Sequence, residues 1–328
     1  MKQFNWAYTL LTFVPERLVS VLHPLTKELF KLQSDISAQI RSIIRSRGGS
    51  SSSSSSSTRP EADEKRLSSS HPTIFHDLLS SKLPPSELSV PRLTEEAVTL
   101  VGAGTVTTAH TLTTIQYHLL ANPAKSARLR AELAAAHARA GAGRPRWQQL
   151  EQLPYLCAVV AEGLRMSYGV SHRLQRVAPD TALRYARADG RAPAAAVIPA
   201  GTPVSMTQMF LHDSPALFPA PAAFAPERWL PLAPAEDAAD DAAAARRRDP
   251  AELRRFLVPF SRGTRQCVGM NLAYAELFLA LGRLWAPAGR GGLEMRLWET
   301  DRADVDVAHD FFNPCPRLGS VGVRAVVL

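Results

Sequence analysis

The sequence predicts a mainly α-helical protein with a small β region. Apolar residues recur at helical spacing from Thr94 to a stop at Asn122-Pro123, and an Ala-rich helix is expected from Ala124 to Ala140. Between residues 170 and 209, short partly β-branched segments are separated by Pro and Gly, a pattern typical of strands. We therefore expect helices to build most of the core and short strands to form one small sheet.

Composition places the chain among globular proteins and excludes several classes of function. Of its 328 residues 45% are hydrophobic and 21% are charged, so the chain is too balanced to be disordered throughout. The net charge of +8 comes from scattered Lys and Arg rather than from one basic stripe, so no nucleic-acid partner is expected. Three cysteines are too few and too far apart for a disulfide framework or a paired-cysteine zinc site.

The chain divides by composition into three regions. Residues 1–47 are expected to form amphipathic helices, either docked on the body or in peripheral contact with a membrane surface. Residues 48–70 contain eight consecutive serines and are interpreted as a flexible linker, and residues 71–328 form the main body. Because no apolar run approaches the ~18 residues of a membrane span, no such span is expected.

Several further elements follow from the pattern of the body. The long helix that starts at Thr94 has a weakened middle, because two glycines and three threonines occupy residues 102–108. Another helix is expected to start at Pro154, and a later one to run from Met270 to Trp285. Residues 232–252, rich in Ala, Asp and Arg, are expected to be an exposed insertion loop.

The most informative segment is residues 260–269, FSRGTRQCVG, in which one cysteine lies in a glycine-punctuated loop just before a predicted helix. A helix N-terminus and a neighbouring Arg both favour a thiolate, and glycines let the backbone approach a flat ligand closely. The alternative for a lone cysteine is a buried packing residue. Cys267 is therefore a candidate axial ligand for a flat group that binds against this loop.

This segment resembles the haem-binding signature of the cytochrome P450 family. The resemblance implies a cytochrome P450 fold with haem b as cofactor and Cys267 as the proximal ligand of its iron. It further implies that Arg265 pairs with a haem propionate and that Phe260 packs beside the sulfur, while Gly263 and Gly269 permit the tight loop. Thiolate ligation favours cleavage of the O–O bond.

Glu162 and Arg165, three residues apart on the helix that starts at Pro154, can form an ion pair. Periodicity alone puts the pair opposite the apolar face and so predicts an ordinary solvated salt bridge. In the family, however, a Glu-x-x-Arg pair is completed by an arginine of a Pro-Glu-Arg element, which Arg228 matches here. The resemblance thus implies a structural cluster of Glu162, Arg165 and Arg228 that braces the fold around the haem.

Two further features come from the resemblance. Arg176 is offered as a second propionate partner, with His172 and Arg173 as rivals. The weakened helix is similar to the distal helix of the family, with matches at Ala103, Gly104 and Thr107. Val106, however, stands at the position of the family's acid and cannot relay a proton. Thr107 either bonds bound oxygen or bonds back to its own helix.

The function implied is that of a haem-thiolate monooxygenase that hydroxylates or epoxidises an apolar secondary metabolite, a terpenoid among the candidates. Residues 297–318 and 112–123 look more particularly like fungal members near the trichodiene-oxygenase group. Partners implied by the family are O2 and an NADPH-cytochrome reductase, at the cytosolic face of the endoplasmic reticulum membrane. The chain is expected to match the second half of the family's fold and to be incomplete at the N-terminus, without the family's membrane anchor.

Two alternatives remain from the sequence. The chain is an inactive truncated fragment or haem-binding pseudoenzyme if its pocket is not closed. It is a haem-thiolate isomerase or dehydratase if Val106 reflects chemistry that needs no activation of O2. Stoichiometric haem together with a red-shifted carbon monoxide Soret band in the purified protein would eliminate a fragment whose pocket is not closed.

Overall fold

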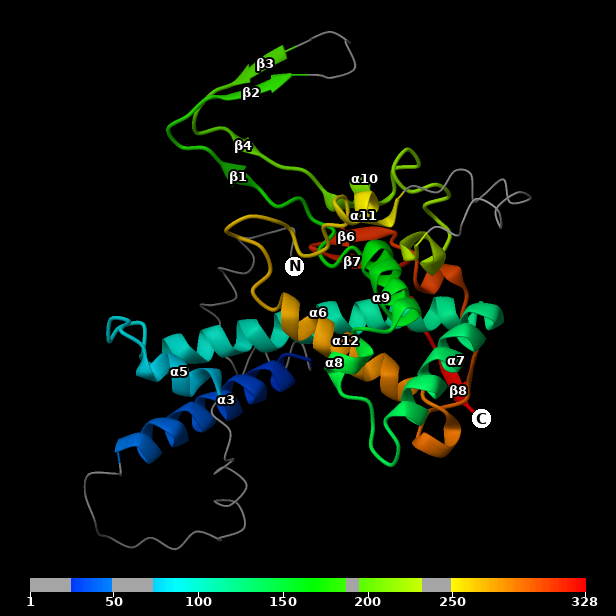
Figure 1. Ribbon diagram of the computed structural model, residues 1–328. Helices are drawn as coiled ribbons and strands as arrows, with labels where there is room; N and C mark the ends of the chain where they lie inside the picture. Colours follow the sequence, from blue (N-terminus) through cyan, green and yellow to red (C-terminus); the bar gives the residue numbers. More distant parts are fainter. Residues whose placement is uncertain (1–24, 49–72, 187–194, 232–248) are drawn as a thin grey trace, which may run out of the picture. The chain divides into compact units, whose positions relative to one another are not determined.

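The computed structural model describes residues 25–48, 73–186, 195–231 and 249–328 of the chain (Figure 1). Contacts group the residues into two compact units, Met1–Thr105 and Val106–Leu328, and the boundary falls inside the long helix α6 (Val90–Leu120). Residues 1–24 and most of the serine-rich segment lie outside the described residues. In the part of the chain that is described, no helix is both long and apolar enough to cross a bilayer.

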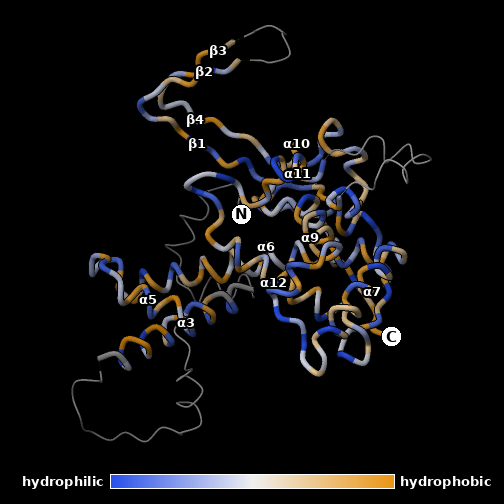
Figure 2. The backbone as a smooth tube through the Cα atoms, in the orientation of Figure 1, coloured by the Kyte–Doolittle hydropathy of each residue, from blue (hydrophilic) through white to orange (hydrophobic). Residues whose placement is uncertain are grey.

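The first unit is built from α3 (Leu25–Gly48), α5 (Ile74–Ser80) and the start of α6. Figure 2 shows apolar and polar positions alternating along α3, the pattern of an amphipathic helix. Ile36 and Ile40 of α3 pack with Leu93 and Ala97 of α6 in a small core of their own. Ile36 and Ile40 of α3 are therefore buried within the first unit.

The longer helices of the second unit share one large core. Its helices are α7 (Pro123–Arg139), α8 (Trp147–Leu150), α9 (Pro154–Ser167), α10 (Gln208–His212), α11 (Pro250–Arg254) and α12 (Met270–Leu284). Buried side chains from the second half of α6, from α7, α9 and α12 form this core, among them Ile115, Leu129, Leu156 and Leu281. The prediction of a mainly helical fold is confirmed: Pro154 starts α9 as expected, and α7 starts at Pro123, one residue before its predicted start.

The strands form four separate two-stranded antiparallel ladders rather than the one small sheet expected. The pairs are β1 (Arg176–Val177) with β4 (Pro203–Val204), β2 (Leu183–Ala186) with β3 (Ala195–Ile198), β5 (Met295–Leu297) with β8 (Ala325–Val327), and β6 (His309–Phe311) with β7 (Asn313–Cys315). β2 and β3 pair in the register Leu183↔Ile198. Strands of two to four residues, mostly exposed, cannot carry a shared buried face, so each pair remains separate.

One predicted loop is partly wrong. Residues 232–248 of the expected insertion loop lie outside the described residues, but the end of the segment forms α11. The Asp249 carboxylate accepts a hydrogen bond from the Ala251 backbone N–H at 2.9 Å, and Pro250 is the first helical residue. Leu253 is 1% exposed and anchors the short helix in a core with Trp229. The run of charges from Arg246 to Arg248 indicated an exposed loop, so the helix start next to it was not predicted.

Helix α9 is buried on every side, which the periodicity of its apolar residues did not predict. Leu156, Val160 and Leu164 pack into the main core, while Ala158 and Ala161 pack into a second core against Phe218 and Trp229. A methyl group at Gly163 would lie 2.1 Å from Cγ1 of Ile115. The missing side chain at Gly163 therefore lets α9 approach α6 closely.

The substitution Gly163→Ala is expected to destabilise the protein by about 1–3 kcal/mol, because the added methyl overlaps a fully buried Ile side chain. Urea unfolding followed by circular dichroism measures the effect. The matched control is Gly102→Ala, where an added methyl meets nothing within 4 Å. That change should be neutral or stabilising by up to about 1 kcal/mol, and equal losses in both variants would contradict the close packing of α9 on α6.

Candidate functional site

The segment that carries Cys267 is a closed loop between α11 and α12. The Cys267 backbone N–H donates to the Phe260 carbonyl at 2.9 Å, and the Gln266 N–H donates to the Gly263 carbonyl at 3.1 Å. Gly263 has φ 79°, a left-handed conformation that glycine adopts without steric cost. Cys267 is exposed and Val268 is 92% exposed, so the alternative of a buried packing cysteine is wrong.

The sulfur of Cys267 lies beside the N-terminus of α12. Gly269 is the N-cap residue of that 15-residue helix, and a methyl group at Gly269 would lie 3.9 Å from Cys267 Sγ. Exposed Arg262 and Arg265 belong to the same loop. The N–H groups at a helix start favour an anionic ligand or side chain, and the two arginines add positive charge to the same loop.

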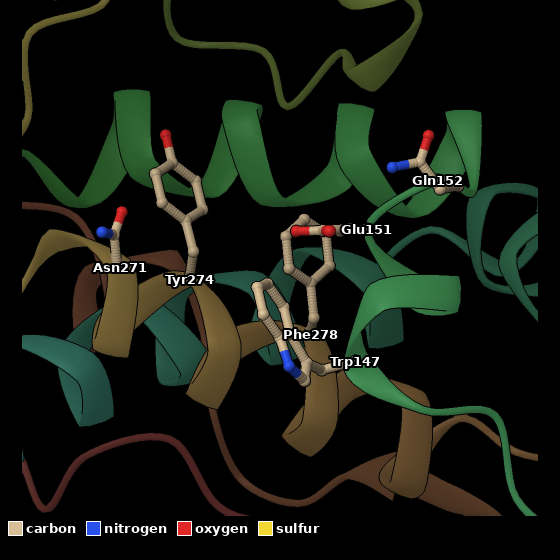
Figure 3. Close-up of a pocket in the computed structure, with 6 residues that line it drawn as sticks. All are labelled: Trp147, Glu151, Gln152, Asn271, Tyr274 and Phe278. Carbon is tan, nitrogen blue, oxygen red and sulfur yellow. The ribbon is translucent and has the colours of Figure 1, made fainter.

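An aromatic row runs from the cysteine loop along α12. The rings of Phe260 and Tyr274 have centroids 5.2 Å apart, and those of Tyr274 and Phe278 are 6.2 Å apart. Tyr274 and Phe278 also line a cavity of about 440 Å³ with Trp147, Glu151, Gln152 and Asn271 (Figure 3). None of the site residues expected from the sequence lines this cavity.

Within the second unit, two hydrogen bonds fix α6 beside α12 and α9. The Thr108 hydroxyl donates to a Glu276 carboxylate oxygen of α12 at 3.1 Å, and the hydroxyls of Thr111 and Ser167 are 2.9 Å apart. Val106 is 48% exposed and Thr107 is partly buried. The part of the helix with Ala103 and Gly104 belongs to the first unit, and a methyl group at Gly104 would meet nothing within 4 Å.

Glu162 is the centre of a fully buried cluster. Its Oε1 accepts hydrogen bonds from Arg165 Nη2 (2.9 Å), Arg228 Nε (3.1 Å) and the Ala225 backbone N–H (2.9 Å), and its Oε2 accepts from Arg165 Nε (3.0 Å) and Trp229 Nε1 (2.9 Å). Burial by itself raises the pKa of this carboxyl, but the Arg165 and Arg228 guanidinium groups outweigh burial and hold the pKa below its usual value.

The two arginines of the cluster extend it to backbone carbonyls. Arg165 Nη1 donates to the His212 carbonyl at 2.9 Å and Arg165 Nη2 to the Pro221 carbonyl at 2.7 Å, while Arg228 Nη1 donates to the Pro219 carbonyl at 3.1 Å. Glu162 and Arg165 are both 0% exposed, which overturns the solvated salt bridge that periodicity alone predicts. The cluster therefore joins α9 to residues 212–229 with buried charge-assisted bonds.

The three propionate candidates lie at or just before β1, and all are exposed. Arg176 Nη1 donates to the Gln175 carbonyl at 2.9 Å, and His172 Nδ1 is 3.0 Å from an Asp310 carboxylate oxygen. His172 is thus engaged in an ion pair when protonated. Arg176 and its two rivals, Arg173 and His172, stay predictions for the propionate.

Sequence reasoning missed three side chains that support the site, namely Trp229, His212 and Glu276. The only sequence signal for Glu276 is a lone acid inside an otherwise apolar helix. Among the described residues no three His, Cys, Asp or Glu side chains cluster to hold a bare metal ion.

Comparison with known proteins identifies the family. The model of the family described as Cytochrome P450 matches residues 1–285. The chain belongs to the cytochrome P450 family. A P450 carries haem, and the exposed Cys267 at the start of α12 fits the family's thiolate ligand, because the loop leaves open space around Gly263 for a flat group.

Curated relatives come from fungi. The chain is 37% identical to tryptophan 6-hydroxylase fscE of Fusarium equiseti, over 100% of the chain and 56% of the relative. It is 39% identical to N-acetyltryptophan 6-hydroxylase ivoC of Emericella nidulans, over 98% of the chain and 55% of the relative. It is 37% identical to the fusicoccadiene C-8 hydroxylase of Alternaria brassicicola, over 99% of the chain and 55% of the relative. The chain thus spans about half the length of the curated relatives it matches.

Proposed function

We propose that this chain is the haem-thiolate part of a monooxygenase, with haem b bound through Cys267. The observation that carries the proposal is the exposed thiol beside the N-terminus of α12, in a loop that matches the P450 signature. The relatives with printed activities are hydroxylases, which supports hydroxylation over isomerisation or dehydration.

Bound haem would supply activation of O2 and insertion of one oxygen atom into a C–H bond. Cys267 would donate negative charge to the iron, and Arg265 would neutralise a propionate, with Arg176 as a second partner. Phe260 would shield the sulfur from water, while Gly263 and Gly269 would keep the loop thin. The Glu162–Arg165–Arg228 cluster would brace the segments that precede the loop.

Helix α6 corresponds to the family's distal helix, and its residues Ala103, Gly104 and Thr107 match that helix in the family. Small residues at 103 and 104 would leave room for substrate, and the Thr107 hydroxyl would offer a hydrogen bond. Val106 is half exposed and apolar, so it would exclude water rather than carry a proton. Proton delivery in this chain would therefore use a hydroxyl or water route and not a carboxylate at position 106.

The proposed substrate is an apolar or aromatic secondary metabolite. The relatives act on an indole amino acid, its N-acetyl form and a fusicoccadiene, and their names support the class without selecting a member. A P450 monooxygenase also needs electrons and O2. We propose an NADPH-cytochrome reductase as donor and the cytosolic face of the endoplasmic reticulum as location, on family membership alone.

Replacing Cys267 with serine tests the proposal. Purified protein supplied with haemin should bind haem stoichiometrically and give a red-shifted carbon monoxide Soret band when reduced, because a thiolate lies opposite carbon monoxide. Cys267→Ser should abolish the red-shifted band. The control Cys315→Ser, in the half-buried β7, should keep it. A band that survives Cys267→Ser would overturn the proposal.

A further inference from the structure

His212, the last residue of α10, is fully buried between two backbone groups of distant segments. Its Nδ1 lies 3.0 Å from the Arg165 carbonyl oxygen at the end of α9, and its Nε2 lies 3.0 Å from the Val258 backbone nitrogen. A carbonyl only accepts and an amide N–H only donates. Nδ1 must therefore carry the hydrogen and Nε2 must accept, which fixes the ring as one neutral tautomer.

The two ends of this bridge belong to the two parts of the site. At one end, Arg165 is an arginine of the buried Glu162 cluster, and its Nη1 donates back to the His212 carbonyl at 2.9 Å. At the other end, Val258 is two residues before Phe260, whose carbonyl accepts the Cys267 N–H at 2.9 Å. His212 is thus the side chain that connects the buried cluster to the start of the cysteine loop.

Close packing holds the same segment against the end of α9. A methyl group at Gly169 would lie 3.1 Å from the Pro259 carbonyl oxygen, so the backbones approach too closely for a larger residue to fit without a shift. Gln208 of α10 donates to the Val170 carbonyl at 2.8 Å and also to the Tyr168 carbonyl. Around His212, therefore, the turn after α9 packs closely with helix α10 and with residues 258–260.

We propose that His212 is a positioning residue for Cys267, which holds residues 258–260 against α9 through the bond to the Val258 N–H and so fixes the place of the sulfur. The inference rests on the proposed function in that the sulfur is the haem ligand. The bond to Arg165 anchors the ring, whereas the bond to Val258 transmits its position to the loop.

The surroundings of the ring keep it neutral. Burial, with the Arg165 guanidinium as a second cause, lowers the pKa of His212 to about 4, and the Glu162 carboxylate opposes this shift only in part. Tyr168 stacks at a ring distance of 6.2 Å with its hydroxyl bonded to Asp213, and Phe218 lies edge-on at 6.3 Å. The acceptor at Nε2 is therefore available throughout the neutral range.

Two substitutions separate the two bonds. Asparagine at 212 places an amide N–H near the position of Nδ1 and lacks the acceptor for Val258, whereas glutamine places an oxygen near Nε2 and lacks the donor for Arg165. Each removes one buried bond, so a purely structural residue would respond similarly to both. If His212 positions the loop, His212→Asn should release residues 258–260 from α9, whereas His212→Gln should leave them in place.

The decisive measurement is amide hydrogen exchange of the haem-free chain. Exchange at Val258 and at Gln266 and Cys267 should accelerate by about tenfold or more in His212→Asn and by less than about threefold in His212→Gln. The matched control is His118→Asn, which removes a buried histidine that stacks on Phe224. It should leave exchange in the loop unchanged.

Equal acceleration in the Asn and Gln variants, or the same acceleration in His118→Asn, would overturn the inference. In haem-loaded protein, His212→Asn should convert much of the red-shifted carbon monoxide band to the unshifted band of a lost thiolate, and His212→Gln should retain the red-shifted band. The exchange experiment needs no haem. Failure of the unsubstituted protein to give the red-shifted band would count against the proposed function, whereas the exchange pattern alone decides the positioning role.

Discussion

Replacing Glu162 with glutamine is expected to lower the free energy of unfolding by about 3–5 kcal/mol. Three donors converge on Oε1 of Glu162 and two on Oε2, and the residue is 0% exposed. The amide NH2 of glutamine would replace one oxygen and face at least two donors, and the Arg165 and Arg228 charges would lose their counterion. Urea unfolding monitored by circular dichroism measures the loss.

An exposed ion pair of the same unit provides the control. Arg302 Nε and an Asp306 oxygen are 2.7 Å apart, and their side chains are 50% and 47% exposed. Asp306→Asn should cost about 1 kcal/mol or less, because water screens exposed pairs. If Glu162→Gln lowered the free energy of unfolding no more than Asp306→Asn does, the charges of the cluster would not be what stabilises it.

Acidification from pH 7 to pH 5 is expected to destabilise the protein by about 4 kcal/mol, about 2 kcal/mol from each of two buried histidines. Burial lowers the pKa of both His118 and His212 from 6.5 to about 4, with Arg302 and Arg165 as the next causes respectively. At these two positions the unfolded chain therefore takes up protons below pH 6.5, whereas the folded chain does not until about pH 4. The stability that these two histidines contribute is fully present above pH 6.5 and is lost as the pH falls from 6.5 to about 4.

The measurement is the free energy of unfolding in urea at pH 7, 6 and 5. His118→Phe removes one titrating ring and keeps an aromatic partner for the stacked Phe224 ring, 4.9 Å away. The variant should lose only about half as much stability between pH 7 and pH 5 as the unsubstituted chain. A stability that does not change between pH 7 and pH 5 would contradict neutral buried histidines.

Local sequence signals predicted much of the helical fold. Pro123 and Pro154 start α7 and α9, because proline is tolerated at the first helical position and its missing N–H costs nothing there. Asp249-Pro250 carries the same kind of signal for α11, but an Arg run next to it led to a loop prediction. Strands β1 to β4 fall within residues 170–209, where strands were expected, but the pattern of residues did not show that the strands separate into two-stranded ladders.

The candidate site, like the fold, could be predicted only in part from the sequence. The spacing of FSRGTRQCVG in residues 260–269 nominated Cys267, and the family resemblance assembled Glu162, Arg165 and Arg228. Periodicity, however, put Glu162 on a solvated face, because it shows that one face is apolar and cannot show that the other is covered. Trp229 and the backbone N–H of Ala225, more than 60 residues away along the chain, complete the cluster.

By itself the sequence predicted most of the long helices and nominated one cysteine as a ligand, since caps, stops and loop chemistry act over a few residues. Only the tertiary structure decided that Cys267 is exposed beside a helix start, that Glu162 accepts five donors, and that His212 bridges Arg165 and Val258. Burial and hydrogen-bond partners depend on segments 46 to 67 residues apart along the chain meeting in space, and no local pattern encodes that meeting.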